Sequence, residues 1–171
     1  SERPTMYSMG TRVLAAQNAI VKRLPSVETL GSVSAICSDK TGTLTLNQMT
    51  VRNVWAGKRL LEVTGAGYEP AGEFRHNGIP VNAGDDDILM RLLRVAALCN
   101  DALLSDTSAG WGVIGDPTEG ALLTLAAKAG LCKGELDEQQ PRLGEVPFES
   151  AKQYMATLHA EKGRRTTYLK G

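Results

Sequence analysis

The run Asp39-Lys40-Thr41-Gly42-Thr43-Leu44-Thr45 constrains the fold more than any other feature, because it follows the apolar, β-prone segment Ser34–Cys37. An aspartate directly after a buried strand is typical of open α/β sheets, which bind ligands at the carboxyl ends of their strands. Aspartate can also attack phosphorus as a covalent nucleophile. Hydroxyls and N–H groups of the following turn can bind phosphoryl oxygens, and Gly42 permits close approach of the backbone. The run therefore predicts a phosphoryl-transfer site at Asp39 rather than an ordinary Asx turn.

The composition excludes several function classes. The 171 residues allow one medium domain or two small ones. Lys+Arg and Asp+Glu are both 19, so no basic surface indicates a nucleic-acid partner. No apolar run approaches the roughly 18–20 residues that span a bilayer. The 3 cysteines and 2 histidines have no metal-ligand spacing, so we expect reduced thiols and no metal site built on these residues.

Hydrophobic patterning predicts a hairpin and two helices. Thr50–Trp55 and Arg59–Thr64 alternate in β fashion around Gly57, which predicts an antiparallel hairpin. Helical spacing predicts helices over Asp85–Cys99 and Pro117–Ala129. The apolar stripe of the first helix is formed by Ile88, Leu92, Val95 and Cys99, and is widened by Leu89, Leu93 and Ala96.

Three further strands are expected in the last part of the chain, over Gly144–Pro147, Tyr154–His159 and Thr166–Leu169. Strands, then helices, then strands again predict an α+β fold with an antiparallel sheet and helices on one side. Near Asn47–Thr50 the residue pattern changes from one typical of parallel sheets to one typical of hairpins. We therefore expect a domain boundary between residues 48 and 49.

Three other short motifs are open to two interpretations each. Gly115-Asp116-Pro117-Thr118-Glu119 is a good capping box, and its residues alone favour a structural role. Pro147-Phe148 precedes Lys152 by four positions, which is compatible with a base-stacking platform or with a core phenylalanine. Lys170-Gly171 at a strand end suits phosphate or a base edge, although the pair is weak alone.

Together, and in this order, the motifs resemble the P-type cation-transporting ATPases, and closely the branch that includes the calcium pumps. The resemblance covers nearly the whole chain. It is carried by Gly10-Thr11-Arg12, Asn18–Val21, Leu24–Gly31, Ile36–Thr45, Asn47–Val51, Cys99-Asn100-Asp101, Gly115–Glu119, Pro147-Phe148 and Lys170-Gly171. It implies that 1–48 is the N-terminal part of a haloacid-dehalogenase-like α/β phosphorylation domain, incomplete here, and that 49–171 is a nucleotide-binding domain truncated at its C-terminus.

The resemblance implies roles for the first motif. Asp39 is expected to take the γ-phosphoryl group of ATP and become an aspartyl phosphate. Mg²⁺ is expected to bind Asp39, the backbone of Thr41, and a later aspartate that the chain lacks. Thr43 is expected to bind phosphoryl oxygen.

The resemblance also implies an ATP-binding pocket in the second part. Glu119 and Phe148 are expected to line the adenosine pocket, and Lys170-Gly171 to close it. Many members have a lysine where this chain has Gln153, so Lys152 is the candidate that replaces it.

The implied protein is an ATPase that uses ATP and Mg²⁺ and couples hydrolysis to cation transport, with Ca²⁺ as the best match. The chain is expected to be a cytoplasmic piece of an integral membrane protein. Its partners are expected to be the remaining pump domains and the membrane helices, which bind the transported cation. Alone, without parallel neighbours for the Asp39 strand and without the distal carboxylate, it is not expected to turn over ATP.

Two alternatives stay open at this point. A soluble haloacid-dehalogenase-type phosphatase shares the nucleophilic aspartate, but it typically has an acid–base aspartate where this chain has Thr41. A nucleotide-binding module without catalysis is the other alternative. No Walker A or Rossmann glycine pattern is present, which excludes P-loop and dinucleotide sites of those types.

Overall fold

The computed structural model describes residues 12–19, 22, 32–39, 48–108 and 110–171. The chain divides into two compact units, Ser1–Leu44 and Thr45–Gly171. The predicted domain assignment, 1–48 and 49–171, stays a prediction.

The prediction of a buried strand over Ser34–Cys37, directly before Asp39, is wrong. Residues 34–37 are exposed and adopt no regular secondary structure. A buried parallel strand requires neighbouring strands and covering helices, and the described residues of the first unit include no strand. Thr41 and Thr43 lie outside the described residues.

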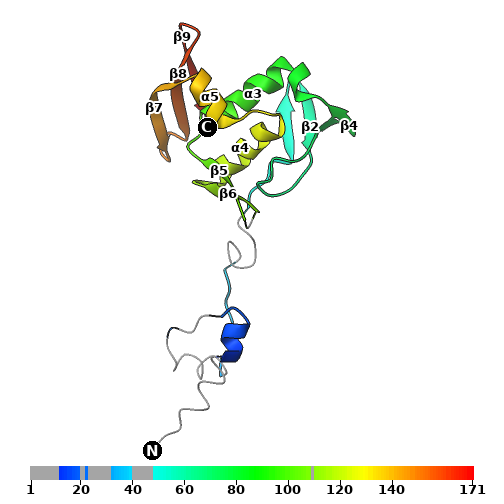
Figure 1. Ribbon diagram of the computed structural model, residues 1–171, viewed down its shortest axis with the longest axis vertical. Helices are drawn as coiled ribbons and strands as arrows, with labels where there is room; N and C mark the ends of the chain where they lie inside the picture. The colour runs from blue at the N-terminus through cyan, green and yellow to red at the C-terminus, as the bar shows by residue number, and fades with distance from the viewer. Residues whose placement is uncertain (1–11, 20–21, 23–31, 40–47, 109) are drawn as a thin grey trace, which may run out of the picture. The chain divides into compact units, whose positions relative to one another are not determined.

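The second unit is α+β, as predicted. Its elements are β1 (Asn53–Ala56), β2 (Arg59–Val63), β3 (Phe74–His76), β4 (Ile79–Val81), the 3₁₀ turn η2 (Ala83–Asp85), α3 (Asp87–Leu98), β5 (Leu103–Thr107), β6 (Gly110–Ile114), α4 (Pro117–Lys128), α5 (Lys133–Gln139), β7 (Arg142–Glu149), β8 (Tyr154–Glu161) and β9 (Arg164–Lys170). All strand pairs are antiparallel, in a β1-β2-β3-β4 sheet, a β5-β6 hairpin and a β7-β8-β9 sheet. Helices α3 and α4 lie between the two larger sheets (Figure 1).

Tight turns set the register of three hairpins. Gly57-Lys58, Asn77-Gly78 and Lys162-Gly163 each place two consecutive residues at positive φ, with values of 57° and 63°, 52° and 78°, and 47° and 80°. Such type I′ geometry matches the right-handed twist of the flanking strands. The hairpin predicted around Gly57 is confirmed, with Trp55 opposite Leu60.

Both predicted helices are present, and each begins at an aspartate cap. Asp86 accepts hydrogen bonds from the N–H groups of Ile88 and Leu89 at 3.0 and 3.1 Å. Leu89 and Leu93 are fully buried, whereas Ile88 is 56% exposed, so the predicted stripe is displaced around the helix. The displacement follows from packing, since α3 contacts α4, α5 and strands of both large sheets.

One core joins the first sheet to the helices. Its fully buried side chains include Leu61, Leu89, Leu93 and Leu98, and Phe74, Leu123 and Leu125 are nearly so. The core therefore fixes α4, and with it the turn that precedes α4. Among the described residues, no helix combines the length and the apolar character that a membrane span requires.

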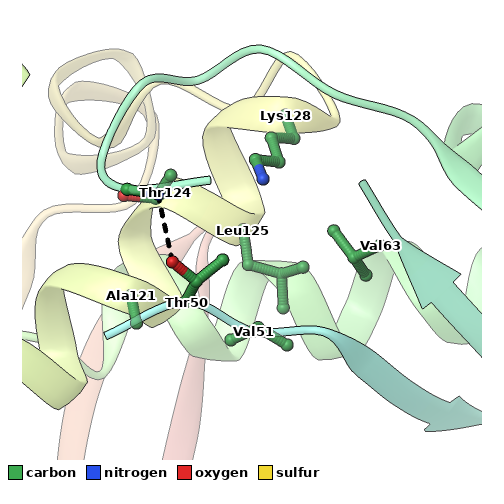
Figure 2. Close-up of a pocket in the computed structure, with 8 residues that line it drawn as sticks. Thr50, Val51, Val63, Ala121, Thr124, Leu125 and Lys128 are labelled. Carbon is green, nitrogen blue, oxygen red and sulfur yellow. Dashed lines mark hydrogen bonds between the residues drawn. The ribbon is translucent and has the colours of Figure 1, made fainter. Parts of the chain in front are cut away.

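A small pocket beside α4 is a packing junction. Figure 2 shows Thr50 and Val51 lying over the helix face that carries Ala121 and Leu125. Thr50 Oγ1 accepts a 3.1 Å hydrogen bond from the N–H of Gly67, and the space is too narrow for a water molecule. This junction leaves no room for a ligand.

Acid is expected to weaken the α3 cap. The hydrogen bond from the Leu89 N–H, aided by those from Arg59 and the Ile88 N–H, lowers the pKa of Asp86 from its ordinary value of 3.8, although partial burial opposes the shift. A lowered carboxylate pKa adds stability above about pH 4, which is lost as the pH falls through the folded-state value. We expect Asp86→Ala to lower the free energy of unfolding by about 1 kcal/mol at neutral pH. This loss of stability should shrink when urea unfolding is measured below pH 3. Asp106→Ala, at an exposed position of β5, is the control and should cost less stability at neutral pH.

Candidate nucleotide pocket

A cavity of about 690 Å³ opens between the start of α4 and the β7-β8-β9 sheet. Ligand pockets typically have volumes of about 300–1,000 Å³. Its lining residues come from three of the predicted motifs and from neighbouring positions: Asp101, Asp116, Thr118, Glu119, Leu122, Pro147, Phe148, Met155, Lys170 and Gly171. The fold thus brings together the motifs around Glu119, Phe148 and Lys170.

An ion pair joins two sides of the cavity. Lys170 Nζ lies 2.6 Å from Glu119 Oε1, although 51 positions separate the two residues. Only 21% and 17% of the respective side chains are exposed. Glu119 Oε2 also accepts a 3.1 Å hydrogen bond from the N–H of Asp101. The prediction that Lys170 and Glu119 flank one pocket is confirmed.

The turn before α4 is both a helix cap and part of the cavity wall. Asp116 Oδ1 accepts hydrogen bonds from the N–H groups of Thr118 at 2.8 Å and Glu119 at 3.2 Å. The hydrogen bond from the Glu119 N–H, followed by those from Thr118 and by the nearby Lys170 charge, lowers the pKa of Asp116, although burial opposes this shift. The N-cap at Asp116 is therefore confirmed, and it fixes the place of Glu119 in the first helical turn. The Glu119 carboxylate binds Lys170 and the Asp101 N–H rather than the Asp116 N–H that a capping box requires.

Phe148 is a surface residue of the cavity. It lies on β7 after Pro147 and is 58% exposed, so the alternative of a core phenylalanine is excluded. Met155, which is 1% exposed, and the half-buried Leu122 supply further apolar lining. An exposed aromatic ring in a cavity with further apolar lining is suited to stacking by a planar ring.

Lys152 lies outside the set of residues that line the cavity. Its Nζ pairs with Glu149 Oε1 at 2.8 Å on the surface. Its predicted ATP-binding role stays a prediction. Asp39 is exposed and belongs to the other unit, and its predicted catalytic role likewise stays untested.

The described residues contain no cluster of three or more His, Cys, Asp or Glu side chains that could bind a metal ion. The predicted Mg²⁺ ligands, Asp39 and the backbone of Thr41, include a residue outside the described ranges. The magnesium site therefore remains a prediction.

Sequence reasoning assigned no role to three of the lining residues, Asp101, Leu122 and Met155. Leu122 lies one helical turn after Glu119, which places the two on one face of α4. Met155 pairs with Lys170 across β8 and β9. Helical and strand spacing could therefore have indicated Leu122 and Met155, whereas the backbone N–H of Asp101 leaves no signal in the side-chain pattern.

Gly115 is expected to tolerate no side chain. Its φ is 120°, and an added Cβ would lie 3.1 Å from Ala102 Cα. We expect Gly115→Ala to lower the free energy of unfolding by about 1–3 kcal/mol through backbone strain. Gly112, three positions earlier on β6, is a matched control, since the nearest atom to an added Cβ is 4.0 Å away and its φ is ordinary. Equal melting temperatures for Gly115→Ala and Gly112→Ala would contradict the assigned strain.

Comparison with known proteins agrees with this geometry. A family model described as P-type ATPase, cytoplasmic domain N, matches residues 88–171. The chain is 51% identical over 169 residues to the cation-transporting ATPase pma1 of Synechocystis sp., which covers 96% of this chain and 19% of that protein. It is 42% identical over 158 residues to a calcium-transporting ATPase of Bacillus subtilis, covering 92% of this chain and 18% of that protein.

A human relative, calcium-transporting ATPase type 2C member 1, is 41% identical over 150 residues, covering 87% of this chain and 16% of that protein. The chain thus spans less than a fifth of the length of these curated relatives. The matched motifs and the cavity they form lead to one assignment: the chain belongs to the P-type ATPase family, and residues 88–171 are its match to cytoplasmic domain N.

Proposed function

We propose that the cavity binds the adenosine part of ATP, within a larger protein that couples ATP hydrolysis to cation transport across a membrane. The observation that carries the proposal is the juxtaposition of the exposed Phe148 ring with the Glu119–Lys170 ion pair in one cavity. These residues come from three separate parts of the sequence. Packing of the core does not require an exposed phenylalanine there.

The chemistry of the lining favours a nucleoside over a bare phosphate. Asp101, Asp116 and Glu119 present carboxylates, which accept hydrogen bonds from an exocyclic amine or from ribose hydroxyls and repel phosphate. Phe148 supplies a face for the base. Among the described residues that line the cavity, Lys170 is the one cation, so it is suited to a base edge or to the start of the phosphate chain.

In the longer protein, Asp39 is proposed to attack the γ-phosphorus of ATP. A bond forms between a carboxylate oxygen of Asp39 and that phosphorus, the bond to the bridging oxygen breaks, and ADP leaves. Thr41 and Thr43 are proposed to bind the phosphoryl oxygens, and Mg²⁺ supplies charge stabilisation when it is bound. The presence of Thr41 in place of an acid–base aspartate disfavours rapid hydrolysis of the aspartyl phosphate, as a pump requires and a phosphatase does not.

Calcium is the proposed cargo, because several relatives carry that ion in their names. We propose that the transported cation binds among the membrane helices of the larger protein. We propose a cytoplasmic location for the described domain in an integral membrane protein. Nucleotide binding without hydrolysis is the activity expected of the 171-residue chain itself.

Replacement of Lys170 tests the pocket. Lys170→Ala removes the cation and leaves the largely buried Glu119 carboxylate without its ion-pair partner, so we expect the Kd for ATP to rise about tenfold. Isothermal titration of the chain with ATP measures this change. Arg165→Ala, an exposed cation on the same strand, is the matched control and should leave the Kd unchanged. Equal affinities for all three proteins would exclude Lys170 from the ATP site.

A further inference from the structure

We propose that Asn100, supported by Arg142, is a positioning residue that fixes the orientation of the Glu119 carboxylate in the nucleotide pocket. This inference rests on the proposed function in one respect, namely that Glu119 contacts the nucleotide. Neither Asn100 nor Arg142 lines the cavity. Their effect on Glu119 passes through the backbone at Asp101, a residue that does line the cavity.

Asn100 ties the end of α3 to the first turn of α4. Its side chain is fully buried. Its Nδ2 donates to the carbonyl oxygens of Ala96 at 2.9 Å and Glu119 at 2.8 Å, and its Oδ1 accepts from the N–H of Ala102 at 2.8 Å. The asparagine amide donates two hydrogen bonds and accepts one at the same position, which aspartate, serine or leucine cannot do.

Arg142 holds the same segment from β7, the strand that also carries Phe148. Its Nη2 donates to the carbonyl oxygens of Leu98 at 3.2 Å and Asn100 at 2.9 Å. Its Nη1 pairs with Asp101 Oδ1 at 2.6 Å. These bonds satisfy carbonyl groups that the end of α3 leaves open, and they fix the path of the chain through Asp101.

The consequence for Glu119 is that both of its oxygens are held. The Asp101 N–H donates to Oε2 at 3.1 Å, and Lys170 donates to Oε1 at 2.6 Å. The terminal torsion of a glutamate side chain is otherwise broad. Each carboxylate oxygen retains a further lone pair for a ligand donor, now in a fixed direction.

A purely structural role for Asn100 is the competing explanation, and the chain offers a matched control. Gln140 is another buried amide, 3% exposed, with side-chain bonds to Glu161 at 3.0 Å and Tyr168 at 2.7 Å. It lies outside the set of residues that line the nucleotide cavity. Loss of either amide should destabilise the fold, but only loss of Asn100 should act on Glu119.

A double-mutant cycle on the 171-residue chain tests the inference. We expect Asn100→Ala to raise the Kd for ATP about fivefold when Glu119 is present, and to have no further effect in a Glu119→Ala background. Gln140→Ala should lower the melting temperature to a similar extent and leave the Kd unchanged. Additive effects of Asn100→Ala and Glu119→Ala would overturn the proposal.

Amide hydrogen exchange at Asp101 provides a readout that does not require ATP. Protection of this amide should fall in Asn100→Ala and in Glu119→Ala, and persist in Gln140→Ala. Arg142→Gln, at a partly exposed site, should give the same loss if Asn100→Ala does not fold. If the unaltered chain fails to bind ATP, the proposed function fails, and the exchange result still decides the positioning role: unchanged protection of Asp101 in Asn100→Ala and Arg142→Gln refutes it.

Discussion

Replacement of Asp39 by asparagine is expected to abolish the covalent phosphorylation proposed for the longer pump to which this chain is assigned. An amide oxygen is a far weaker nucleophile than a carboxylate, so no acyl phosphate can form at this position. The protein is incubated with Mg-ATP labelled on the γ-phosphate and quenched in acid. The unaltered protein should retain label that hydroxylamine releases, and the Asp39→Asn protein should retain none.

A matched control for this experiment is Asp106→Asn, at an exposed aspartate of β5. It should be labelled as strongly as the unaltered protein. An acid-stable, hydroxylamine-sensitive adduct on the Asp39→Asn protein would assign the phosphoryl acceptor to another residue.

Replacement of Phe148 by alanine is expected to weaken ATP binding by about tenfold or more. Base–aromatic stacking contributes roughly 1–3 kcal/mol in nucleic-acid complexes, and about 1.4 kcal/mol corresponds to a tenfold change in Kd. Because Phe148 is 58% exposed, the change should cost little folding stability. Isothermal titration and thermal melting of the same samples separate the two effects.

Two further variants sharpen the Phe148 test. Phe148→Trp keeps an aromatic face and should bind ATP with little change. Leu143→Ala removes another exposed apolar side chain of β7, 53% exposed, that lies outside the set of cavity-lining residues. If Phe148→Ala binds like Leu143→Ala, the ring does not stack on the base.

Local sequence signals predicted several elements of the second unit, including α4, which carries Glu119. Asp86 and Asp116 are cap residues followed by helical patterns, and both cap the helices that the sequence indicates. The alternating pattern around Gly57 gave the correct hairpin, because a positive-φ turn and an apolar face specify both register and burial. The pairing of Glu119 with Lys170 is a long-range contact, and it was expected from family resemblance rather than from periodicity.

Other features lay outside the reach of local signals. Ser34–Cys37 has the composition of a buried strand, but strand formation depends on partners that the pattern does not contain. The β5-β6 hairpin and α5 were not anticipated. The first contains Gly110 and Gly112 and few buried side chains, and the second is a 7-residue, largely polar helix, so neither shows a clear period.

Local sequence patterns also did not predict the hydrogen-bond network around Asn100. The Cys99-Asn100-Asp101 run contributed to the family resemblance, but nothing in it predicts that its backbone would bind Glu119. Three of its contacts join groups at least 18 positions apart, from Asn100 to Glu119, from Asp101 to Glu119 and from Arg142 to Asp101. Such contacts depend on the packing of α3 against α4 and β7.

The central claim is that ATP binds in the cavity between α4 and the β7-β8-β9 sheet, and amide chemical-shift mapping tests it most directly. The 171-residue chain, labelled with ¹⁵N, is titrated with ATP. We predict saturable shifts concentrated at Asp101, Glu119, Phe148 and Lys170, with amides of β1 to β4 unchanged. Shifts confined to other parts of the chain, or no saturable shift at millimolar ATP, would contradict the assignment of this cavity as the nucleotide site.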